Sequence, residues 1–276
     1  MSLLYNPASK KLLDRIVLDM PHALLLDGPD GVGLATIARD IAWHDLAGVI
    51  QSTDADGNVD TSTKGSIRIS QVRELIQSTR GKLTSRRVYV IDDIDKMTLQ
   101  SQNAFLKLLE EPNEFTSFIL TTHRPQQLLP TVLSRVQRVH IGLVSDADSR
   151  AFIKKNGISD TRKTEQLLFL ASGLPAELTR LIKDEARFAT QSKYVADART
   201  LLQGTPYERA MIAHKYHGDR VSALDMLTLG QRIARHSLQT TATEALVART
   251  EHLANTYERI AANGNIRLQL MDFVLQ

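Results

Sequence analysis

The sequence predicts an α/β domain with a parallel sheet, followed by two helical domains. Three observations lead to this prediction: short continuous apolar runs in the first half, a glycine-rich turn after the first run, and helical patterning from Ser145 onward. Strands buried on both faces of a parallel sheet give continuous apolar runs rather than alternating ones. We therefore expect an α/β domain over residues 1–143, a small helical domain over 144–188 and an all-helical domain over 189–276.

The elements of the first domain follow from its apolar runs and their breakers. Apolar runs predict four strands, at residues 23–27, 88–92, 116–122 and 138–142. Helical patterning predicts helices over 34–46 and 101–111, and Pro112 ends the second because proline cannot continue a helix. The stretch 51–66 is rich in Ser, Thr, Asp and Gly, which favours a surface loop.

Beyond Ser145 the pattern is helical. Short helices are expected over 146–155, 164–172 and 175–189. From residue 191 the helical pattern runs almost to the end, with turns expected near 204–206 and 263–265.

Composition limits the class of protein. A chain of 276 residues with 42% hydrophobic content can bury a sizeable core. The absence of cysteine excludes disulfides, thiol nucleophiles and thiolate zinc sites, and it suits a reducing cytoplasm. The apolar runs are too short for a membrane span, and no secretory signal pattern opens the sequence. We expect a cytoplasmic protein without a membrane partner.

The glycine-rich turn has the context of a phosphate-binding P-loop but lacks two of its functional side chains. It begins at Gly28, continues through Gly31 and Gly33, follows a strand and opens a helix. In the pattern G-x-x-x-x-G-K-[ST], backbone N–H groups and a helix N-terminus hold phosphate. Leu34 stands at the Lys position and Ala35 at the position of the metal-binding hydroxyl.

These two replacements predict loss of ATP hydrolysis. A Lys ammonium about 4 Å from a phosphate charge contributes roughly 4 kcal/mol at an effective dielectric near 20. Thr36 comes one position too late to replace the hydroxyl, because adjacent helical residues point about 100° apart. The competing interpretation of the turn is a plain tight turn that holds no nucleotide.

An acidic pair and a threonine follow two of the expected strands. Asp92 and Asp93 stand where a Walker B element places one carboxylate for Mg²⁺ and one for the attacking water. Thr122 ends the next strand, at the position of a γ-phosphate sensor. As the alternative, the two aspartates cap the following turn.

Ser134 and Arg135 form a second candidate site. An arginine reaching into a neighbour's site can stabilise phosphoryl charge, because its planar guanidinium stays charged. The alternative for Arg135 is a solvated or salt-bridged side chain.

These motifs, in this order, resemble the bacterial clamp-loader family of AAA+ ATPases. The N-A-x-L-K-x-L-E-E-P stretch at 103–112 is highly specific to that family, and the firm match covers roughly residues 20–142. Further matching segments are 67–75, 92–97, 121–125, 129–137 and, in the last helix, 265–268.

The resemblance implies an α/β P-loop AAA+ domain, a helical lid and an all-α collar. It also implies a circular pentamer with gamma/tau and delta subunits, which opens a sliding clamp and loads it onto primed DNA. By the same mapping Arg135 is the finger offered to ATP on a neighbouring subunit, and Ser134 shapes its turn. Ala176 stands where the ATP-hydrolysing members have a lid arginine, which is a second replacement that argues against ATP hydrolysis by this chain.

Two departures from the family pattern bear on the expectation. Val136 replaces the usual cysteine after the motif arginine, and the family's four-cysteine zinc module is missing, with the polar 51–66 stretch in its place. We expect no metal, no cofactor and no activity of the chain's own. Two alternatives remain: an ATP-binding AAA+ ATPase of the gamma/tau type, and an AAA+-derived adaptor outside replication.

Overall fold

The structure is a computed structural model that describes residues 3–60, 65–80, 85–240 and 243–275. It divides into two compact units, Met1–Ile182 and Lys183–Gln276. The predicted lid helices fall in the first unit, and the division into three domains stays a prediction. Within the described residues, no helix is long and apolar enough to cross a membrane.

The first unit is built on a five-stranded parallel sheet, which confirms the predicted fold class. Its strands are β1 (Ala23–Asp27), β2 (Leu46–Ile50), β3 (Arg87–Ile91), β4 (Thr116–Thr122) and β5 (Gln137–His140). They lie in the order β2-β3-β4-β1-β5, and every neighbouring pair is parallel. The neighbouring strands β1 and β4 are buried along their whole length.

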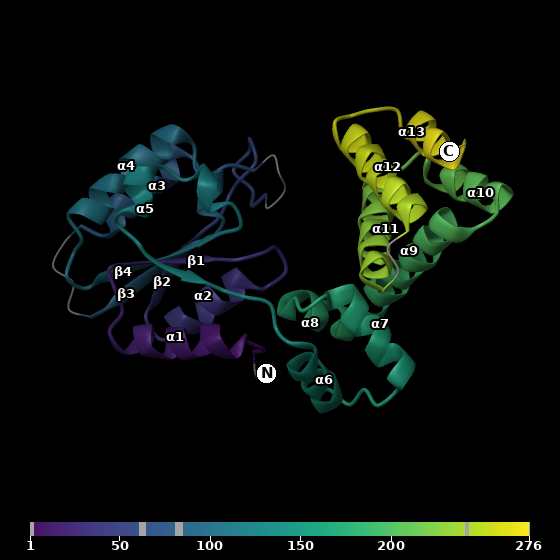
Figure 1. The fold of residues 1–276 in the computed structure, drawn as a ribbon. Helices are drawn as coiled ribbons and strands as arrows, with labels where there is room; N and C mark the ends of the chain where they lie inside the picture. The colour runs from purple at the N-terminus through teal and green to yellow at the C-terminus, as the bar shows by residue number, and fades with distance from the viewer. Residues whose placement is uncertain (1–2, 61–64, 81–84, 241–242, 276) are drawn as a thin grey trace. The chain divides into compact units, whose positions relative to one another are not determined.

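Helices cover both faces of the sheet (Figure 1). The helices are α1 (Pro7–Leu18), α2 (Leu34–Ala42), α3 (Ile69–Ser78), α4 (Leu99–Glu110) and α5 (Pro130–Leu133), with short turns η1 (Ile94–Lys96) and η2 (Pro125–Gln127). Leu25 of β1 packs into the core with α3, α4 and α5, whereas Leu24 and Leu26 pack with α1 and α2. Successive strand side chains point to opposite faces, so one strand supplies both cores.

Four elements of this unit were not predicted from the sequence: the helices α1, α3 and α5 and the strand β2. Helix α2 ends at Ala42, and the following residues form β2, an edge strand that pairs only with β3. Pairing with a buried neighbour overrides the weak helical pattern there. Helix α1 was not predicted, although Asn6 followed by Pro7 is a helix-start signal: the Asn6 side chain accepts hydrogen bonds from the first-turn N–H groups.

The polar 51–66 stretch is a loop with local pairing where it is described. Thr53 forms antiparallel bridges with Val59 and with Ser66. Residues 61–64 of the stretch lie outside the described residues.

Three lid helices follow the sheet. They are α6 (Asp146–Lys155), α7 (Thr161–Ala171) and α8 (Pro175–Lys183). The helix predicted over 175–189 is interrupted because Asp184 accepts a hydrogen bond from Arg187 N and caps a new helix, α9 (Glu185–Gln203).

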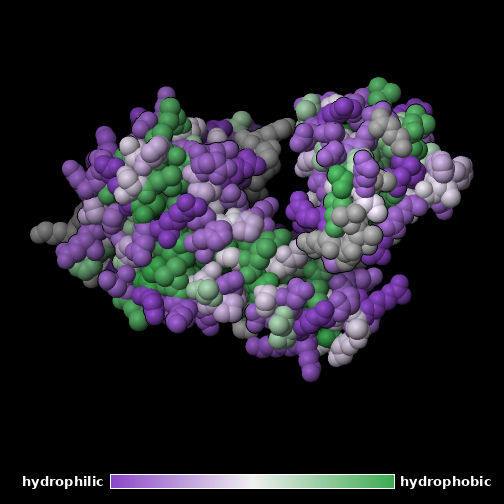
Figure 2. Space-filling model, in the orientation of Figure 1, coloured by the Kyte–Doolittle hydropathy of each residue, from purple (hydrophilic) through white to green (hydrophobic). Residues whose placement is uncertain are grey.

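The second unit is a helical bundle. After α9 it contains α10 (Pro206–Tyr216), α11 (Arg220–Thr240), α12 (Glu244–Ala261) and α13 (Ile266–Leu275). Helix α11 packs against α9 and α12, and Gly230 lets Leu253 approach closely at this crossing. Hydrophilic residues cover much of the face shown in Figure 2, as expected of helices whose apolar sides face a core.

Candidate functional site

The glycine-rich turn connects β1 to α2 at the carboxyl edge of the sheet. Gly31 and Gly33 have φ angles of 88° and 92°, which side chains other than glycine rarely adopt. Gly33 is the residue before the first turn of α2, as the P-loop pattern requires. Gly28 lies against strand-end backbone, where a Cβ atom would come within 2.6 Å of the Ile141 carbonyl oxygen.

The Lys position of this loop faces the core. Leu34 is 2% exposed and packs in the cluster formed by β1, α1 and α2. Ala35 is partly buried, and Thr36 is exposed. The side chain that would meet phosphate is therefore part of the apolar interior.

The first turn of lid helix α8 lies directly on the loop. The Ala176 and Glu177 N–H groups donate to the Gly31 carbonyl oxygen at 3.0 and 3.3 Å. A Cβ atom at Gly33 would lie 3.1 Å from the Ala176 Cβ, and one at Gly31 would lie 3.2 Å from Leu174. Helix-start N–H groups of this kind bind anions when they have no other acceptor. Here a backbone carbonyl of the same chain is their acceptor.

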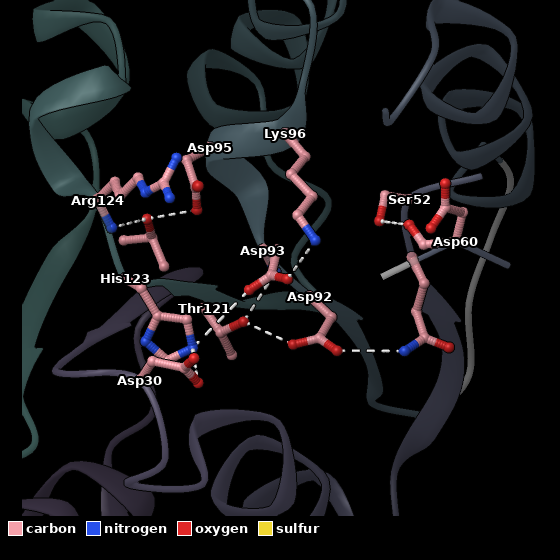
Figure 3. Close-up of polar contacts among 12 residues, drawn as sticks. Asp30, Ser52, Asp60, Asp92, Asp93, Asp95, Lys96, Thr121, His123 and Arg124 are labelled. Atoms are coloured by element: carbon pink, nitrogen blue, oxygen red, sulfur yellow. Dashed lines mark hydrogen bonds and ion pairs between the residues drawn. The ribbon is translucent and has the colours of Figure 1, made fainter. Parts of the chain in front are cut away.

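The acidic pair is engaged by side chains of its own chain (Figure 3). Asp92 accepts hydrogen bonds from the Thr121 hydroxyl at 2.8 Å and from the Gln51 amide at 3.2 Å. The Asp93 backbone N–H donates to the Thr121 oxygen at 2.9 Å, and the Asp93 carboxylate lies 3.0 Å from Lys96 Nζ. Thr121, rather than Thr122, is the threonine that joins the two aspartates.

Thr122 points elsewhere. It is fully buried, and its hydroxyl donates to Asp95 at 2.7 Å while accepting from the Arg124 N–H at 3.0 Å. Adjacent residues of β4 face opposite sides of the sheet, which separates Thr122 from its neighbour Thr121. Its sensor role stays a prediction, and in this structure its hydroxyl stabilises the turn after β3.

His123 is one of the side chains at this edge that sequence reasoning missed. Its Nδ1 lies 2.8 Å from the Gly28 carbonyl oxygen, so Nδ1 carries the proton and donates. Its Nε2 lies 3.9 Å from Asp30 and 4.0 Å from Asp93. The available signal was its place directly after β4, because β4 pairs with β1 and their carboxyl ends meet at the loop.

A second polar cluster lies beside the loop, at the end of β1. The Asp27 carboxylate is 4% exposed and accepts two hydrogen bonds from Arg138, at 2.6 and 3.0 Å, and one from His140 at 2.8 Å. Burial alone would raise the pKa of Asp27, but the hydrogen bonds and charges of Arg138 and His140 outweigh it and hold that pKa below its usual value.

The candidate finger is separated from all these groups. Arg135 follows α5 and precedes β5, whose first residue, Gln137, pairs with Leu24 near the start of β1. Because the strands are parallel, Arg135 lies toward the amino edge of the sheet, opposite the loop. The structure thus brings Gly28, Gly31, Gly33, Asp92 and Asp93 to one edge and places Ser134 and Arg135 at the other.

Arg135 is held by three acceptors. Its Nη1 donates to the Thr131 carbonyl at 2.9 Å and to the Ser134 hydroxyl at 3.3 Å, and its Nη2 lies 3.0 Å from a carboxylate oxygen of Glu110. The Arg135 side chain is 36% exposed. It is available at the surface in a defined orientation.

The described residues contain no group of three or more His, Cys, Asp or Glu side chains placed to hold a metal ion. What this arrangement offers chemically is an oriented surface guanidinium on one edge of the sheet and an internally bonded loop on the other.

Comparison with known proteins points to one family. Residues 7–144 match the family model described as DNA polymerase III, delta subunit. Over 154 residues the chain is 32% identical to the DNA polymerase III subunit delta' of Bacillus subtilis. The matched region covers 50% of this chain and 45% of that protein. Over 137 residues it is 33% identical to the subunit tau/gamma of Haemophilus influenzae, covering 44% of this chain and 20% of that protein. The chain spans about half the length of the delta' relatives it matches.

A solved structure has the same fold. It is a DNA polymerase III, gamma subunit-related protein from Thermotoga maritima, with a TM-score of 0.54 over 97% of both chains at 19% identity. This likeness shows the fold alone.

Proposed function

This chain belongs to the DNA polymerase III delta-subunit family, and we propose that it is a delta-prime-type, non-hydrolysing subunit of a replicative clamp loader. In this role it supplies Arg135 to ATP bound on a neighbouring gamma/tau subunit. It acts with gamma/tau and delta subunits in the cytoplasm, and through them on the sliding clamp and primed DNA.

The observation that carries the proposal is the contrast between the two edges of the sheet. At the loop, Leu34 is buried where a lysine would meet phosphate, and the first N–H groups of the lid helix are bonded to the Gly31 carbonyl oxygen. At the other edge, Arg135 is half-exposed and oriented. Because the guanidinium is ion-paired with Glu110 and lies at the edge opposite its own loop, any ATP on which it acts is bound to another molecule.

The loop geometry also favours this proposal over an ATPase of the gamma/tau type. Such an enzyme needs a cation and a metal-binding hydroxyl at the phosphate. Leu34 and Ala35 supply neither, and the carboxylates of Asp92 and Asp93 are engaged by Thr121, Gln51 and Lys96.

The proposal is tested by reconstitution with gamma/tau and delta subunits from the same organism. The gamma/tau partner carries alanine at its own Ser-Arg motif arginine, so that Arg135 is the one motif arginine left to serve an ATP site. We expect Arg135→Ala to leave assembly intact and to lower clamp-stimulated ATP turnover by about 100-fold or more, because a finger acts in the transition state.

Arg150→Ala is the matched control. Arg150 is also a half-exposed arginine paired with a glutamate, Glu165, but it lies in the lid. We expect wild-type turnover from it. Unchanged turnover in Arg135→Ala would overturn the finger assignment, and a chain that fails to join the complex would favour an adaptor outside replication.

A further inference from the structure

We propose that Glu110 is a positioning residue for Arg135, which fixes the guanidinium before the neighbouring ATP site closes on it. This inference rests on the proposed function, since it concerns how the finger is presented. Glu110 is the last residue of α4 and Arg135 follows α5, so two helices meet in this pair.

Helix α4 contacts the segment that carries Arg135 at two places. Buried Gln102 in the first turns of α4 accepts a hydrogen bond from the Leu129 N–H at 2.9 Å, which fixes the chain just before α5. At the other end of α4, Glu110 holds the guanidinium itself. Helix α4 therefore fixes both the start of the segment and the side chain that it presents.

The pair orients the guanidinium without burying it. The side chains of Arg135 and Glu110 are 36% and 49% exposed, and such half-exposed ion pairs are weak. An arginine loses rotamer freedom when it is fixed, and a partner that fixes it beforehand removes that cost from the later step. Among the described residues Arg135 Nε donates to no group, so part of the fork remains for phosphate.

Glu111 provides a matched control. It is the next residue, has the same side chain, is also exposed and makes no ion pair within the described part of the chain. A general effect of charge at the end of α4 would appear in both glutamates. A positioning effect appears in Glu110 alone.

The experiment uses the reconstituted complex in which the gamma/tau motif arginine is alanine, and compares Glu110→Gln, Glu111→Gln, Arg135→Ala and the double variant Glu110→Gln/Arg135→Ala. We expect Glu110→Gln to lower the kcat of ATP turnover by about two- to fivefold, the size that a half-exposed pair supplies, with KM for ATP unchanged. We expect Glu111→Gln to match wild type and the double variant to match Arg135→Ala, because a positioning residue has no effect once its target is gone.

The outcomes separate this inference from the proposed function. If Arg135→Ala leaves turnover unchanged, the proposed function fails. If Arg135→Ala lowers turnover but Glu110→Gln does not, or if both glutamate variants lower it equally, the positioning role fails. A rise in kcat for Glu110→Gln would show that the carboxylate competes with ATP for the guanidinium, and would also overturn it. Further loss in the double variant would assign Glu110 a separate, structural role.

Discussion

Leu34 makes the glycine-rich loop contribute to the stability of the core rather than to ligand binding. A lysine here would direct its charge toward a ligand, whereas Leu34 is 2% exposed and packs with α1, α2 and β1. Burial of a leucine side chain contributes about 2 kcal/mol to folding. The first turn of α2 has thus become part of the core.

Restoring the lysine is therefore expected to cost stability. We predict that Leu34→Lys lowers the free energy of unfolding by about 3 kcal/mol, because it removes buried apolar contacts and places an ammonium in their position. Denaturant unfolding measures this, with Thr36→Lys on the exposed side of the same turn as the control. Equal stability of the two variants would contradict the packing role of Leu34.

Asp27 gives the chain an acid-sensitive contribution. Its pKa is lowered in the folded state, so the stabilisation is present above the ordinary carboxyl value near 4 and is lost as the pH falls through the lowered pKa. We expect Asp27→Asn to be less stable than wild type at pH 7, and the two unfolding free energies to converge as the pH is lowered from 7 to below the ordinary carboxyl value near 4. A constant difference across that range would show that the carboxylate charge contributes nothing.

At the scale of elements, the first turn of helix α8 packs against the glycine-rich loop. Gly33 and Gly57 both have positive φ, near 90°, but an added Cβ meets Ala176 at 3.1 Å in the first case and nothing within 4 Å in the second. The two glycines therefore separate backbone strain from contact with the lid.

We predict that Gly33→Ala destabilises the chain more than Gly57→Ala. Both variants lose about 1–2 kcal/mol to the left-handed backbone, and Gly33→Ala must in addition displace the first turn of α8. Urea unfolding of the two variants gives the difference. If Gly57→Ala costs as much as Gly33→Ala, the lid does not rest on the loop as described.

Local patterns predicted the elements that are buried along their length, and long-range contacts decided the rest. The runs of β1 and β4 predicted buried strands because both are enclosed on two faces. Edge strand β2 has an exposed, irregular pattern and becomes a strand through its pairing with β3. Its five residues, LAGVI, are also an apolar run, but Gly48 weakens the strand signal and the run directly follows a helical pattern.

In the candidate site, too, local motifs predicted some residues, whereas others were found only through long-range contacts. The motifs placed the glycines and the acidic pair directly after expected strands, and in the structure these strand ends meet at the carboxyl edge because the strands are parallel. The partners of those groups come from distant segments: Gln51 for Asp92, the start of α8 for Gly31 and His123 for Gly28. No spacing rule within one segment predicts such pairs.

At the scale of the whole molecule, we expect nucleotide to leave the stability of the isolated chain unchanged. A ligand that binds the folded chain at 100 times its Kd adds about 2.7 kcal/mol to stability and raises Tm. We expect ATP with Mg²⁺ at about 5 mM to leave the Tm of the isolated chain unchanged, as measured by calorimetry, while a gamma/tau subunit under the same conditions is stabilised. A raised Tm for this chain would show that its loop still binds nucleotide and would support the gamma/tau-type alternative.

The burial of Leu34 also limits how this loop can change in evolution. With an apolar side chain packed at this position, a single substitution to lysine passes through a less stable protein before any catalytic gain appears. Selection against unstable intermediates then opposes such a change. If the chain serves as we propose, the folding of this loop keeps ATP hydrolysis with the neighbouring subunits, because a lysine at this position lowers the stability of the chain.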